Sequence, residues 1–170
     1  SIINILKHSE FFKDTKIYGD QVENPIFPKN YLGIHKSWNP FKSRNLHLAD
    51  QMCKEILINK YPLNIIEIHN RPFLVKRVSK KINTKILLFF HNDPLKMKGS
   101  KHKSDRQILL NQCEKILCVS EYIKNQFLIG INAKKEKVEV IYNGINRQQK
   151  KFPKKNKEIL YVGKIAKDKG

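Results

Sequence analysis

Short apolar runs alternate with longer amphipathic segments along most of the chain, and this alternation restricts the possible folds more than any other feature. The segments between the runs carry apolar residues at helical spacing, as expected for helices packed on one face. Strands that alternate with helices form βαβ units, and nearly continuous apolar strands are typical of parallel sheets. The sequence therefore predicts an α/β protein with a doubly wound parallel sheet. The runs NIIEIH, KILLFF, KILCVS and KVEVIY predict strands at 64–69, 85–90, 115–120 and 137–142.

Recognisable helix starts precede the amphipathic segments. Ser43 is a predicted N-cap, and Pro72 is suited to the first turn of a helix. Ser104 and Gln107 form a predicted capping box, and Ser120 is expected to cap the next helix. These signals predict helices at about 43–60, 72–82, 104–113 and 121–130.

The ends of the sequence are less regular. Residues 1–11 are predicted to be the tail of a helix, 15–19 a strand, and 20–42 a long irregular loop that holds three of the 7 prolines. Residues 146–157 are rich in lysine and read as a linker, and 158–163 form one further strand. A helix tail at the start and a lone strand at the end predict a chain truncated at both ends.

The chain is strongly basic, with 34 Lys and Arg against 15 Asp and Glu and a net charge of +19. Such a charge raises the alternative of a basic module that binds nucleic acid or another anionic surface without catalysis. The bases are mostly lysines spread along the chain, and no helix-turn-helix, zinc or RNA-recognition motif accompanies them. The sequence therefore argues against nucleic acid as a partner. Two explanations of the positive charge remain: peripheral contact with an anionic membrane, or a bias towards lysine in the composition.

Cysteine usage and hydropathy indicate the compartment. The 3 cysteines form no C-x-x-C pair, and their odd number argues against a disulfide framework. No apolar run approaches the ~20 residues of a membrane span. A cytoplasmic protein is expected, with peripheral association at the cytoplasmic face of the inner membrane as an option.

Two similar turns follow neighbouring predicted strands. Because ligands bind outside the carboxyl ends of parallel strands, both turns could contribute to one polar site, with Arg71 suited to a phosphate or carboxylate. The alternative is that these are ordinary strand exits. Glu67 with the nearby histidines and Asp93 could ligate a metal, but no tight ligand spacing supports this, and no metal is predicted. The turns are His69-Asn70-Arg71-Pro72 and His91-Asn92-Asp93-Pro94.

Phosphate-binding signatures are weak. Neither a Walker loop nor a dinucleotide fingerprint is present. The loop 96–103 carries four lysines. This composition is equally compatible with a mobile basic lid over an anionic ligand and with a solvated loop.

Three motifs in the C-terminal third occur together in a characteristic order: KILCVSEYIKNQF, VEVIYNGIN and EILYVGKIAKDKG. Together with the paired turns, they resemble the retaining glycosyltransferases of family 4, which have the GT-B fold. The resemblance implies a Rossmann-like acceptor domain at 1–145, the interdomain linker at 146–157, and the first strand and loop of a donor-binding domain at 158–170.

The resemblance implies transfer of a sugar from a nucleotide-sugar donor to an acceptor with retention of configuration. The expected acceptor is a cell-envelope glycan or a lipid-linked saccharide, and no cofactor or metal is expected. His91 matches the histidine of the family near the transferred sugar. Gly163, Lys164 and Lys169 match the residues that hold the donor pyrophosphate.

Some positions depart from the family pattern. Lys164 stands where arginine is usual, so a bidentate contact becomes a point charge, and Asn146 replaces the usual aspartate. The glycine-rich first loop and the glutamate pair of the donor domain do not occur in this sequence. We therefore expect the 170-residue chain alone to be inactive.

Overall fold

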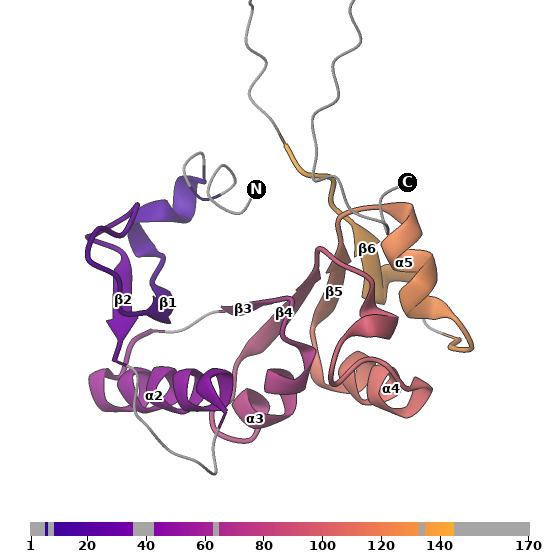
Figure 1. Ribbon diagram of the computed structural model, residues 1–170, viewed down its shortest axis with the longest axis horizontal. Helices are drawn as coiled ribbons and strands as arrows, with labels where there is room; N and C mark the ends of the chain where they lie inside the picture. The colour runs from indigo at the N-terminus through magenta and orange to yellow at the C-terminus, as the bar shows by residue number, and fades with distance from the viewer. Residues whose placement is uncertain (1–5, 7–8, 36–42, 63–64, 133–134, 145–170) are drawn as a thin grey trace, which may run out of the picture.

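The computed structural model describes residues 6, 9–35, 43–62, 65–132 and 135–144 (Figure 1). Short 3-10 turns and helices alternate with strands along most of this length. The strands are β1 (Ile17–Asp20), β2 (Tyr31–Ile34), β3 (Ile65–His69), β4 (Lys85–Phe90), β5 (Lys115–Cys118) and β6 (Val138–Val140). The helices are α2 (Arg44–Asn59), α3 (Val75–Ser79), α4 (Lys103–Gln112) and α5 (Glu121–Leu128). The 3-10 turns are η1 (Glu10–Asp14), η2 (Pro72–Leu74), η3 (Pro94–Lys96) and η4 (Lys135–Lys137).

A four-stranded parallel sheet organises the larger part of the structure. Its strand order is β3-β4-β5-β6, so each strand pairs with the next one along the chain. In the register of the first pair, Ile65 lies opposite Lys85 and His69 opposite Phe89. The predicted α/β class with a parallel sheet is therefore confirmed. β1 and β2 form a separate two-stranded parallel sheet.

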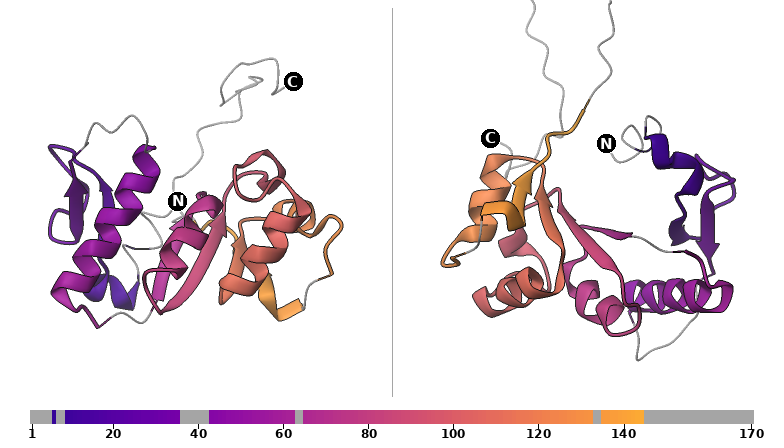
Figure 2. Two further views of the ribbon diagram at one scale, coloured as in Figure 1. Left: turned by 90° about the horizontal axis from the view of Figure 1, so that it is seen from below. Right: turned by 180° about the vertical axis from the view of Figure 1, so that it is seen from behind.

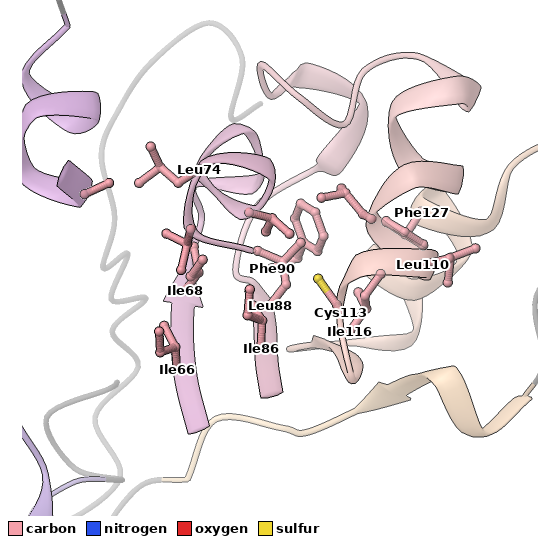
Figure 3. Close-up of a cluster of buried hydrophobic side chains, with 14 of the residues drawn as sticks. Ile66, Ile68, Leu74, Ile86, Leu88, Phe90, Leu110, Cys113, Ile116 and Phe127 are labelled. Atoms are coloured by element: carbon pink, nitrogen blue, oxygen red, sulfur yellow. The ribbon is translucent and has the colours of Figure 1, made fainter. Parts of the chain in front are cut away.

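One face of the four-stranded sheet carries the core. α2, α3 and α4 run along the same side of the strands in both opposed views (Figures 1 and 2). Side chains from this face and from the helices form one cluster, in which the Phe90 and Phe127 ring centroids are 5.5 Å apart (Figure 3). Each fully buried side chain of this size contributes about 1.5–3 kcal/mol. The cluster includes Ile66, Ile68, Leu74, Ile86, Leu88, Phe90, Leu110, Cys113, Ile116 and Phe127.

The opposite face is less covered than the apolar run 85–90 predicted. Leu87 and Phe89 on β4 are only half-buried, so this strand is not enclosed equally on both faces within the described structure. These residues lie beside the exposed Glu67 and the half-buried His69 of β3. The partly open face therefore reaches the edge where the two polar turns begin.

Local differences from the sequence prediction have identifiable causes. The predicted loop 20–42 contains β2, which forms because Tyr31 comes into register with Ile17 of β1. The predicted capping box is wrong, because the N-cap of α4 is His102, two residues before Ser104. The predicted helix 72–82 begins as the 3-10 turn η2 and continues as the short α3.

Two predicted caps lie where expected. Ser120 caps α5, with its Oγ accepting a hydrogen bond from the Ile123 N–H at 3.3 Å. Ser43 occupies the N-cap position of α2, although its side chain makes no capping hydrogen bond. The predicted linker 146–157 and strand 158–163 lie outside the described residues, as does most of the predicted helix tail 1–11.

Candidate functional site

The ends of β3 and β4 bring two histidines together. His69 is the last residue of β3, and His91 directly follows β4. Because the strands are parallel and paired, both residues leave the sheet at the same edge. His69 Nδ1 lies 3.0 Å from His91 Nε2, which is hydrogen-bond distance. The sequence prediction that the two turns share one site agrees with this geometry.

Asn70 links the two turns through its backbone and its side chain. Its φ of 52° lies in the left-handed region, which asparagine tolerates better than most residues. The Asn70 N–H donates to the Phe89 carbonyl at 2.9 Å. Its Oδ1 accepts a hydrogen bond from the His91 N–H at 2.8 Å. Through these two hydrogen bonds, Asn70 fixes the backbone of His91 next to the turn that follows β3.

Arg71 is the cation of this edge. Its guanidinium is exposed and donates one hydrogen bond to the Asn70 carbonyl at 3.0 Å. Among the described residues, no carboxylate forms an ion pair with it. An exposed guanidinium with only one hydrogen bond to the described residues suits an anionic group of a ligand.

An open cavity of about 520 Å³ lies at this edge of the sheet. It draws side chains from the separate two-stranded sheet, from the start of α2, from the two turns and from the segment after β6. Seven of its nine lining residues have polar side chains, which offer hydrogen-bond donors and acceptors of several kinds. Its lining residues are Asp20, Asn45, Leu48, His69, Asn70, Arg71, Leu74, His91 and Asn143.

Three of the polar lining residues were not predicted by the sequence analysis. Asp20 ends β1, and Asn143 follows β6, so both obey the rule that polar residues after parallel strands face one edge. Their positions were therefore available from the sequence. Asn45 lies in the first turn of α2 and carried no comparable signal. Asp20 is paired with Arg44, the first residue of the same helix.

The family model of Glycosyltransferase Family 4 matches residues 15–149. The chain belongs to this family. All the residues that line the cavity lie inside the matched segment. No curated protein gives a significant match. The membership of glycosyltransferase family 4 that the sequence motifs predicted is therefore confirmed, and a sugar donor and an acceptor are the partners that this domain implies.

Asn92 and Asp93, the other predicted site residues that the structure describes, are not on the cavity wall. Asn92 is exposed, and Asp93 caps η3 by accepting the Leu95 N–H at 2.9 Å through Oδ1. In this structure Asp93 therefore has a local structural contact. Gly163, Lys164 and Lys169, predicted to hold the donor phosphates, lie outside the described residues.

The electrostatic setting favours a neutral His91. Partial burial lowers the pKa of this imidazole, and the neighbouring His69 lowers it further. Since an ordinary histidine already titrates below pH 7, the His91 ring of this glycosyltransferase domain is uncharged at neutral pH. A neutral ring has one nitrogen that donates and one that accepts.

Neither a metal cluster nor a reactive thiol occurs in the described part of the domain. No group of three or more His, Cys, Asp or Glu side chains is placed to hold a metal there. Burial raises the pKa of Cys113 and of Cys118 to about 12, so both thiols are protonated at neutral pH.

Among the described helices, none is long and apolar enough to cross a membrane.

Proposed function

We propose that the cavity is the acceptor side of a site that transfers a sugar from a nucleotide-sugar donor, with retention of configuration. The proposed acceptor is a cell-envelope glycan or a lipid-linked saccharide. One observation carries the proposal: in a family 4 chain, His69, Asn70, Arg71 and His91 converge on one open polar cavity at the carboxyl ends of two paired strands. A cavity of this kind suits a hydroxyl-rich ligand that carries an anionic group.

His91 is the residue proposed to act on the reacting sugars. Its uncharged ring lines the cavity, and Asn70 holds its backbone. A fixed hydrogen-bonding group at this position stabilises the transition state without reorganisation. Arg71 is proposed to bind a phosphate or carboxylate of the acceptor, because its exposed guanidinium lines the same cavity.

The donor side of the proposal rests on the sequence motif. Gly163 ends the predicted strand 158–163, and Lys164 and Lys169 follow it. All three are proposed to bind the donor pyrophosphate. The positive charges of the two lysines would stabilise the negative charge that develops on the departing nucleoside diphosphate. In this proposal cationic side chains take the place of a metal ion, and the nucleotide sugar is a substrate, not a cofactor.

Replacing His91 with glutamine should lower the kcat for sugar transfer by about a hundredfold, because a hydrogen-bonding group of the transition state is lost. The measurement is transfer by the full-length protein that carries this sequence, from a panel of nucleotide sugars to lipid-linked and soluble saccharide acceptors. His102→Gln is the matched control, since His102 is exposed at the start of α4 and is not on the cavity wall.

The control should keep the wild-type rate. Equal rates for His91→Gln and the wild-type protein would contradict the role of His91. Transfer with inverted configuration, or no transfer from any nucleotide sugar, would contradict the proposed reaction.

The proposed membrane partner follows from the charge. A net charge of +19 would attract the protein to anionic lipid, where each nearby lysine contributes about 1 kcal/mol. We expect the full-length protein to sediment with phosphatidylcholine vesicles that contain phosphatidylglycerol and to be released by high salt. Equal binding to vesicles of phosphatidylcholine alone, or binding that salt does not weaken, would contradict this electrostatic contact.

A further inference from the structure

Three side chains at the edge of the sheet form a continuous hydrogen-bonded chain. Glu67 Oε2 lies 3.3 Å from His69 Nε2, and the other nitrogen of the same ring, Nδ1, lies 3.0 Å from His91 Nε2. Glu67 is the most exposed member, with 44% of its side chain accessible, against 22% for His69. This hydrogen-bonded chain therefore runs from the exposed Glu67 carboxylate through the His69 imidazole to the His91 imidazole, and both rings lie on the cavity wall.

The order of these groups determines where the protons are. A carboxylate can only accept hydrogen bonds, so the Nε2 of His69 must carry the proton and donate to Glu67. In a neutral His69 the Nδ1 is then an acceptor, and the hydrogen bond between the rings must be donated by His91 Nε2. This leaves His91 Nδ1 without a proton and able to accept a hydrogen bond.

The rings are held in an orientation that keeps this chain intact. His69 stacks on Phe89, with centroids 4.4 Å apart and an interplanar angle of 18°. The ring centroids of His69 and His91 are 5.4 Å apart and their planes are inclined by 27°, so the hydrogen bond joins two nearly coplanar rings at their edges. Among the described residues, His91 Nδ1 has no hydrogen-bond partner. Stacking and the Asn70 contact to the His91 backbone thus restrict the rings, while Glu67 sets the direction of the hydrogen bonds.

We propose that Glu67 is a positioning residue that acts through His69 to keep His91 in the Nε2–H tautomer, with Nδ1 presented as an acceptor to a hydroxyl group of the bound sugar substrate. For two neutral rings, the tautomer follows from the described contacts. Only the identity of the hydroxyl-bearing ligand rests on the proposed function.

The first test measures the tautomers directly. In the ¹⁵N-histidine-labelled protein at about pH 8, above the ordinary range of imidazole titration, long-range ¹H–¹⁵N spectra should show pyrrole-type Nε2 and pyridine-type Nδ1 in both His69 and His91. A pyrrole-type Nδ1 in either ring, or averaged shifts in the wild-type protein, would overturn the proposal without any variant.

The second test removes the carboxylate. In Glu67→Gln the side-chain amide can donate as well as accept, so His69 is no longer confined to one tautomer. The His91 nitrogen shifts should move towards those of a mixture. Glu114→Gln removes an equal charge at an exposed position of the same domain and should leave both rings unchanged. Unchanged shifts in Glu67→Gln would overturn the proposal.

The third readout is kinetic. In the full-length protein, Glu67→Gln should lower kcat at least about tenfold with KM little changed, because a wrongly oriented tautomer affects the reacting state more than binding. If the spectra behave as expected but no variant or wild-type protein transfers sugar, the proposed function fails and the tautomer assignment stands. If the spectra do not respond to Glu67→Gln, the assignment fails whatever the activity.

Discussion

Gly99→Ala should lower the free energy of unfolding by about 3 kcal/mol, of which about 1 kcal/mol comes from the left-handed backbone and about 2 from overlap with a neighbour. Gly99 has a φ of +88°, a conformation that residues with a Cβ rarely adopt. An added Cβ would lie 2.6 Å from the backbone N and Cα of Phe73, which follows β3 in the neighbouring turn. Backbone atoms cannot move aside as the end of a flexible side chain can. The overlap therefore has to be relieved by shifting the loop.

Gly130→Ala separates the two causes. Gly130 also has a left-handed φ of +70°, but the nearest atom to its added Cβ is the Cδ of Lys103 at 3.8 Å. This variant should lose only about 1 kcal/mol. Urea denaturation of both variants at constant m-value measures the difference. An equal loss in the two variants would show that the Gly99 loop does not lie against the Phe73 backbone.

Arg106→Met should also destabilise the protein by about 3 kcal/mol, since hydrogen bonds from a charged group contribute about 1.5–3 kcal/mol each and some of the released carbonyls can regain water. Arg106 is only 3% exposed. Its donors lie 2.8 Å from the carbonyl of Phe127, 3.1 Å from that of Ser100, 2.9 Å from that of Lys101 and 2.6 Å from that of Ile129. One guanidinium thus joins the loop before α4 to the end of α5.

Lysine at the same position tests whether charge or geometry matters. Arg106→Lys keeps the charge but cannot reach acceptors in so many directions, so we expect it to be clearly less stable than the wild-type protein. Arg44→Met is the control, because Arg44 is exposed and its ion pair with Asp20 should contribute less than about 1 kcal/mol. The measurement is again urea denaturation. Wild-type stability of Arg106→Met would contradict the bridging role.

These contacts also resolve the two interpretations of the lysine-rich loop 96–103. Ser100 is fully buried, and its hydroxyl donates to the Pro94 carbonyl at 2.6 Å. With Gly99 against Phe73 and Arg106 bonded to the Ser100 and Lys101 carbonyls, the middle of the loop is fastened to the domain. The lysine side chains 96, 98, 101 and 103 are exposed on this fastened loop. The lysines are therefore solvated, as one of the two interpretations holds, while the bonded middle of the loop does not favour a lid hinged at this point.

The candidate site could be predicted in part because it depends on strand ends. Apolar periodicity identified β3 and β4, and the parallel order implied that His69 and His91 would leave the sheet together. The same rule could have indicated Asp20 and Asn143. It could not separate Arg71, which lines the cavity, from Asp93, which caps η3, because both follow a strand in similar turns.

The sequence by itself determined the α/β class, four strands of the sheet and the family, since these depend on local periodicity and on motifs that are contiguous in the chain. Only the tertiary structure decided that Tyr31–Ile34 is a strand, that Arg106 is buried, and that Glu67 contacts His69. Each of these depends on partners whose positions follow from strand register and packing. A polar side chain becomes buried or part of a hydrogen-bonded chain only where the fold supplies its acceptors, and local sequence does not specify them.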